Sequence, residues 1–114
     1  MFKIAIFGAR SIALGIYTAI KEEYKKCEVS AFLVSDKSQN PDTLAGIPVL
    51  ELSQYNEKLN TILIATPEDT HAEIVSYLQT NGFYNYICID SIKEAQIMEH
   101  YYTNAGKFIS LHSL

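Results

Sequence analysis

A glycine-containing turn near the N-terminus has the residue types of a phosphate-binding loop. Gly8 and Ala13 fit the first and last positions of the pattern G-x-G-x-x-G/A, but Arg10 stands where the middle glycine would be. The pattern lets a phosphate approach the backbone N–H groups at a helix start, and a side chain at its middle position obstructs that approach. A guanidinium nevertheless offers phosphate charge-assisted hydrogen bonds worth roughly 1.5–3 kcal/mol each. The residues predicted to face the phosphate are Gly8, Ala9, Arg10, Ser11 and Ile12. The alternative is a solvated loop that holds no ligand.

An acidic residue follows at the distance expected for a ribose contact. Asp36 lies 23 residues after Ala13 (36 − 13), and a spacing of about 20 separates the glycine turn from the acid that binds ribose hydroxyls. A polar turn explains Asp36 equally well, because turns are rich in Asp and Ser. Both interpretations stay open.

A third loop, with Thr66, Pro67 and His71 as candidates, is expected at the same ligand site. The Thr66 hydroxyl can cap a helix, Pro67 suits the first helical position, and Asp69 can complete a capping box. His71 then falls one turn into the helix, where it either contacts the ligand or packs against a neighbour.

Alternating strands and helices are needed to bring these three loops together. Apolar, β-branched runs predict strands, and apolar residues at helical spacing predict helices. We expect strands at residues 2–7, 29–34, 47–50, 61–65 and 84–89, a last strand or linker at 107–111, helices at 12–26, 66–80 and 91–102, and a short helix or loop at 51–59. Such alternation requires right-handed crossovers and predicts an α/β fold, a doubly wound parallel sheet in three α/β/α layers. Ligands of these sheets bind at the carboxyl ends of the strands.

Length and composition indicate one globular domain, residues 1–114, with a core of its own. The net charge is −4 and Lys and Arg form no stripe, so we expect no nucleic-acid partner. No apolar run reaches the roughly 20 residues that span a membrane, so we expect no membrane insertion. Cys27 and Cys88 have no CxxC partner, which predicts reduced thiols in a cytoplasmic protein without a metal site.

The segment that contains the third loop resembles a segment of a known enzyme family. Residues 64–74 (I-A-T-P-E-D-T-H-A-E-I) resemble the I-A-T-P-N-x-x-H-A-E-I segment of the Gfo/Idh/MocA oxidoreductases. The resemblance implies an NAD(P)-binding Rossmann domain whose catalytic residues belong to a second α/β domain.

Three other segments resemble a second group. Residues 7–11 (F-G-A-R-S), 31–36 (A-F-L-V-S-D) and 45–50 (A-G-I-P-V-L) are similar to the small N-terminal Rossmann domains of bacterial surface-polysaccharide enzymes. These include PglD-type sugar acyltransferases, CapD-like nucleotide-sugar dehydratases and the N-terminal regions of some capsular glycosyltransferases. The resemblance implies a Rossmann-like nucleotide-binding domain, a fragment or N-terminal part of a larger enzyme with its catalytic domain downstream.

Three functions follow from these patterns. The leading one is an accessory domain of a polysaccharide-biosynthesis protein that binds a nucleotide or nucleotide sugar. The alternative is the NAD(P)-binding domain of a Gfo/Idh/MocA-like oxidoreductase without its catalytic domain, and the third is a scaffold without ligand. The oligomeric state stays open, with a homodimer among the alternatives.

The chain alone is expected to show no turnover. The sequence has no nucleophile beside a base and no carboxylate pair placed for acid–base work. Incubation of the purified chain with nucleotide sugars or NAD(P) should therefore yield no product by chromatography. A rate well above background that a single side-chain substitution abolishes would contradict this expectation.

Overall fold

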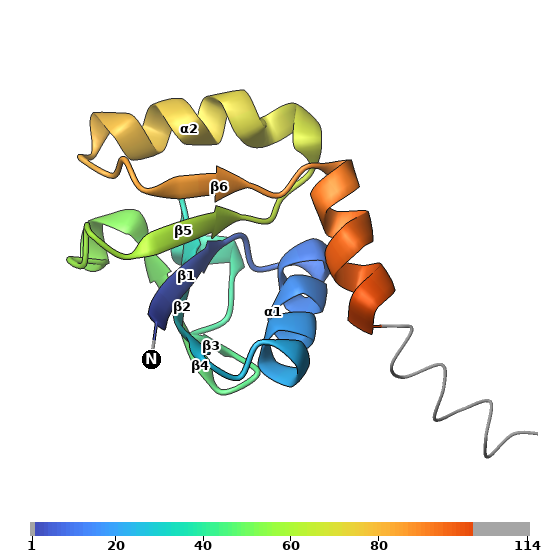
Figure 1. The fold of residues 1–114 in the computed structure, drawn as a ribbon. Coiled ribbons are helices and arrows are strands. Elements are labelled where there is room, and N and C mark those ends of the chain that lie inside the picture. The colour runs from blue at the N-terminus through green and yellow to red at the C-terminus, as the bar shows by residue number, and fades with distance from the viewer. Residues whose placement is uncertain (1, 102–114) are drawn as a thin grey trace, which may run out of the picture.

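The computed structural model describes residues 2–101, which form a six-stranded sheet with helices on both faces (Figure 1). The strands are β1 (Phe2–Phe7), β2 (Cys27–Val34), β3 (Thr43–Leu44), β4 (Ile47–Glu51), β5 (Thr61–Ile64) and β6 (Tyr86–Cys88). Their order is β3-β4-β2-β1-β5-β6, and every pair is parallel except β3 with β4. The predicted doubly wound parallel sheet is confirmed, and strand order reverses between β1 and β5.

α-Helices follow β1, β5 and β6, whereas the chain between β2 and β5 contains no α-helix, only 3-10 turns and short strands. The α-helices are α1 (Ser11–Glu23), α2 (His71–Thr80) and a helix over residues 91–101, with short 3-10 turns η1 (Lys37–Gln39), η2 (Leu52–Gln54) and η3 (Glu68–Thr70). The strand or linker expected at residues 107–111 lies outside the described residues. No helix among residues 2–101 has the length and apolar character needed to span a bilayer.

Two apolar cores lie on opposite faces of the sheet, because side chains alternate along each strand. Ile4 and Ile6 of β1 pack on the face covered by α1 and the helix 91–101. Ala5 and Phe7 pack on the face covered by α2. The central strands are therefore buried on both sides, which explains their continuous apolar sequences.

The antiparallel strand β3 is a feature that the sequence analysis did not predict. It joins β4 in a hairpin through Ala45 and Gly46, whose φ angles are +52° and +80°. Positive φ at both central residues is the geometry of a two-residue hairpin turn that follows the twist of the strands. The segment A-G-I-P-V-L thus forms this turn and the strand β4.

The start of α2 also differs from the prediction. Pro67 leads into the 3-10 turn η3, and α2 begins only at His71. The Thr66 hydroxyl lies 2.8 Å from the Thr70 hydroxyl, and Thr70 donates to the carbonyl of Pro67 at 2.6 Å. The predicted capping box at Thr66 is therefore wrong, because a side-chain partner within the turn competes for its hydroxyl.

Gly8 stands where the ends of β1, β2 and β5 meet. Its N–H donates to the Leu33 carbonyl at 2.8 Å, and its φ is +128°. A Cβ atom at this position would lie 2.7 Å from the Ala65 carbonyl oxygen, closer than non-bonded atoms pack. Gly8 is thus required for the backbone to pass between β2 and β5 before α1 begins.

Replacing Gly8 by alanine should lower the free energy of unfolding by about 2–6 kcal/mol, the sum of positive-φ strain and crowding against Ala65. Urea unfolding of the purified variants measures this loss. Gly46→Ala is the matched control, since Gly46 also has positive φ but no heavy atom lies within 4 Å of the point that a Cβ atom would occupy. It should lose only about 1 kcal/mol from strain. Equal losses at the two positions would contradict the close approach at Gly8.

Candidate functional site

A cleft of about 710 Å³ lies at the carboxyl ends of β1 and β2, beside α2. This volume is within the range of roughly 300–1,000 Å³ common for ligand pockets. Its walls come from the turn after β1, the end of β2 with the loop that follows, the loop after β5, and one flank of α2. The cleft therefore lies at the edge where doubly wound sheets bind ligands, next to the reversal of strand order.

The structure brings most of the predicted site residues to this cleft. Those that line it are Gly8, Ala9, Arg10, Asp36, Thr66 and Pro67. Ser11 and Ile12 instead line a separate groove of about 480 Å³ between α1 and the helix 91–101. His71 is buried, and its Nε2 atom lies 2.9 Å from the Thr66 carbonyl oxygen. His71 therefore contacts the loop before α2 and does not line the cleft.

Arg10 immediately precedes α1 and is exposed at the mouth of the cleft. It makes no side-chain capping bond to the helix, and its Nη2 atom lies 3.5 Å from the Gln39 carbonyl oxygen in η1. A hydrogen bond of that length is weak. The guanidinium is therefore free to turn toward an anion at the start of α1, where the helix dipole also favours negative charge.

Asp36 faces the cleft from the loop after β2. Its Oδ1 atom accepts a hydrogen bond of 2.9 Å from the backbone N–H of Ser38, and the Asn40 amide donates to the Asp36 carbonyl oxygen at 2.9 Å. The bond from Ser38 lowers the pKa of Asp36 from its ordinary value of 3.8. Asp36 is thus ionised at neutral pH and has a second carboxylate oxygen to accept from a hydroxyl group.

One wall of the cleft was missed by the sequence analysis. It is a stripe along α2 and the turn before it, made of Thr70, Glu73, Ile74, Tyr77 and Thr80. Their spacing of three or four residues is a signal for one helix face, but that pattern alone does not show what the face borders. The crossover from β4 to β5 contains only the turn η2 and no α-helix, so within residues 2–101 this crossover leaves the flank of α2 uncovered.

Comparisons with known proteins support the fold class. No protein-family model matches the chain, and no curated protein matches it in sequence. Among solved structures, it is similar to RSP, a Rex-family repressor, with a TM-score of 0.61 and 11% identity, covering 96% of this chain and 62% of that chain. It is also similar to RSP in complex with β-NAD⁺ and operator DNA, with a TM-score of 0.55 and 12% identity, covering 98% and 61%.

These similarities and the reversal of strand order define a Rossmann-like domain. The chain spans about three-fifths of the length of the RSP chains that it matches. At such low identity the likeness establishes the fold.

The exclusion of nucleic-acid partners on the basis of net charge is wrong. RSP, which has a similar fold, is found in complex with operator DNA. Net charge averages over the whole chain, whereas contact with a nucleic acid depends on where cations lie on the surface. An acidic total of −4 therefore excludes no partner of this kind.

The hydrogen bond to Asp36 predicts a dependence of stability on acid. Because its pKa is lowered in the folded chain, its ionised form contributes stability that is present above pH 3.8 and lost as pH falls through the folded-state pKa. The stability difference between the wild-type chain and Asp36→Asn should thus be constant from neutral pH to about pH 5 and change below 3.8. Urea unfolding across this range measures it. A difference that stays constant throughout the acid range would contradict the prediction.

Proposed function

We propose that this chain is a nucleotide-binding module that holds its ligand in the cleft beside α2. The observation that carries the proposal is that Arg10 and Asp36, from loops after different strands, line one cleft. A phosphate group would meet the guanidinium and the start of α1. A ribose hydroxyl would donate to the Asp36 carboxylate, as in other Rossmann-like sites.

The remaining walls suit a nucleobase. Ile74 gives apolar contact, and the Tyr77 ring lies near the Phe7 ring, with centroids 6.3 Å apart. A mostly apolar lining with a few polar groups is typical of small-molecule sites. Arg10 is the only cation among the described residues that line the cleft, which also contains Glu73. The phosphate is therefore assigned to the Arg10 end and the base to the α2 end.

The finer proposal is a nucleotide sugar as ligand, in an accessory domain of a cytoplasmic polysaccharide-biosynthesis protein whose catalytic domain lies elsewhere. It is supported by the resemblance of residues 7–11 and 31–36 to that group, since Phe7, Arg10 and Asp36 of these segments line the cleft. The second candidate ligand is NAD⁺, favoured by the likeness to RSP, which binds β-NAD⁺ in one of its structures.

Arg10→Ala should weaken binding of UDP-glucose by about ten- to a hundredfold, equivalent to roughly 1.5–3 kcal/mol, and reduce its salt dependence. The loss follows from removal of the cation that faces the phosphate. Calorimetric titration of the wild-type chain and the variant measures both effects. Lys21→Ala removes a cation from the far end of α1 and should leave the affinity unchanged.

Arg10→Gly separates the two ligands. If the site belongs to a dinucleotide, removal of the side chain should strengthen NAD⁺ binding by clearing the approach to the backbone. If it belongs to a nucleotide sugar, the glycine variant should weaken UDP-glucose binding as the alanine variant does. Unchanged binding of both ligands in both variants would contradict the nucleotide-binding proposal and favour the scaffold without ligand.

A further inference from the structure

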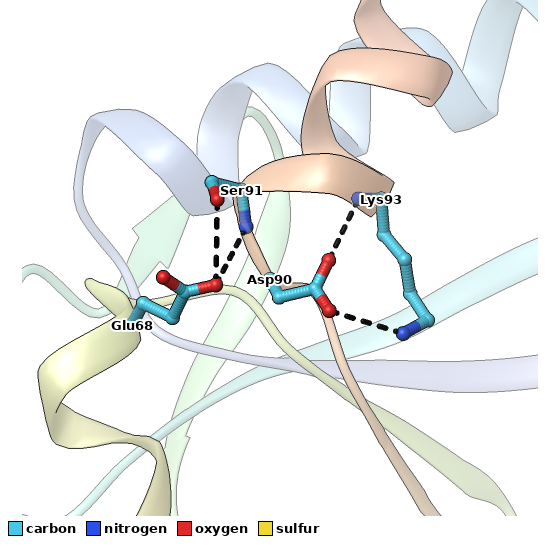
Figure 2. A network of polar contacts seen from close by, with 4 residues as sticks. All are labelled: Glu68, Asp90, Ser91 and Lys93. Carbon is cyan, nitrogen blue, oxygen red and sulfur yellow. Dashed lines mark hydrogen bonds and ion pairs between the residues drawn. The ribbon is translucent and has the colours of Figure 1, made fainter.

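Two of the helices that begin at the carboxyl edge of the sheet, α1 and the helix 91–101, differ in how their N-termini are satisfied. The start of α1 has no side-chain cap from Arg10. The start of the helix 91–101 receives two carboxylates: Glu68 accepts from the Ser91 N–H at 3.0 Å, and Asp90 accepts from the Lys93 N–H at 2.8 Å. Figure 2 shows both carboxylates turned toward this helix start. An anionic ligand group thus finds one helix start open and the other occupied by negative charge.

The Glu68 contact also joins two loops that follow neighbouring strands. Glu68 begins η3 after β5, and Ser91 begins the helix after β6. The same Glu68 oxygen lies 3.4 Å from the Ser91 hydroxyl (Figure 2). In a doubly wound sheet that binds a dinucleotide, one half of the ligand lies over each side of the strand-order reversal. The bridge from Glu68 to Ser91 therefore lies on the side formed by β5 and β6.

The lining of the cleft ends before the loop after β6. On the β5 side it consists of the loop after β5 and one flank of α2, and it includes none of the described residues that follow β6. The groove that contains Ser91 is a separate one, between α1 and the helix 91–101. The cleft therefore extends from the ends of β1 and β2 to α2 and does not reach the side formed by β6.

Resting on the proposed function, we infer that the site recognises only the nucleoside diphosphate part of its ligand, because the bridge between Glu68 and Ser91 closes the second half-site. The group attached beyond the diphosphate, whether a sugar or a second nucleoside, projects out of the cleft without contacts of its own. The recognised chemistry is a ribonucleoside 5′-diphosphate, with the phosphates at Arg10 and the ribose at Asp36.

Calorimetric titration of the full chain with ADP, UDP and NAD⁺ tests the inference. In the wild-type chain, NAD⁺ should bind with an affinity within about threefold of that of ADP, since its nicotinamide nucleoside makes no contact. In Glu68→Ala, NAD⁺ should tighten at least threefold relative to ADP, because the bridge is lost. The ratio of the two affinities cancels any general effect of removing a negative charge near an anionic ligand.

Two further variants isolate the bridge. Glu68→Gln removes the charge but keeps an oxygen that can accept from the Ser91 N–H, so its affinity ratio should match that of the wild-type chain. Lys93→Ala removes the 3.3 Å contact with Asp90 in the same turn and should also leave the ratio unchanged. Thermal unfolding of each variant confirms that it is folded.

The inference is overturned if the wild-type chain binds NAD⁺ more than threefold more tightly than ADP. It is also overturned if Glu68→Ala leaves the ratio of the two affinities unchanged. The same holds if Glu68→Gln or Lys93→Ala raises this ratio as Glu68→Ala does. These outcomes leave the proposed function standing. If none of ADP, UDP and NAD⁺ binds to the wild-type chain, the proposed function fails instead.

Discussion

The close packing of β1 between β2 and β5 is the constraint on which the ligand edge of this domain depends. At Gly8 the backbone donates to Leu33 on one side, and on the other it passes so near Ala65 that no Cβ atom fits. This fixes the point at which β1 ends and the direction in which α1 starts. The position of Arg10, two residues on, follows from that geometry. Glycine is needed at position 8 for the contact between strands, independently of any ligand. The middle position of the dinucleotide pattern makes no such contact, so it can be occupied by Arg10 without loss of the fold.

The parts of the structure that the sequence predicts are those set by local pattern. Continuous apolar runs marked β1, β2 and β5, because both faces of a central parallel strand are buried. Local pattern does not predict the polar contacts. Thr66 was assigned to a helix cap, but its hydroxyl pairs with Thr70 in a 3-10 turn. The α2 wall, represented by Tyr77, depends on a crossover without a helix, and only the three-dimensional arrangement shows that this flank is uncovered.

The positions of individual charged side chains explain the candidate ligand cleft better than the net charge of the chain does. The chain is acidic overall, yet its candidate ligand cleft combines one guanidinium with the carboxylates of Asp36 and Glu73. Whether a ligand atom is attracted or repelled depends on its distance from each of these groups, because screening by salt removes the contribution of distant surface charges. For the same reason, the net charge of −4 does not exclude a nucleic-acid partner.

The hairpin of β3 and β4 has a consequence for how the sheet meets other molecules. An uncovered edge strand presents unpaired N–H and C=O groups to any extended peptide, and short or irregular edges discourage such pairing. Here the parallel strand β4 is shielded by β3, which has only two residues, Thr43–Leu44. Among residues 2–101, the chain itself thus covers the first two residues of the last parallel strand on this side, Ile47 and Pro48. The short hairpin leaves only a two-residue edge strand outside, which discourages uncontrolled strand addition and aggregation on that side.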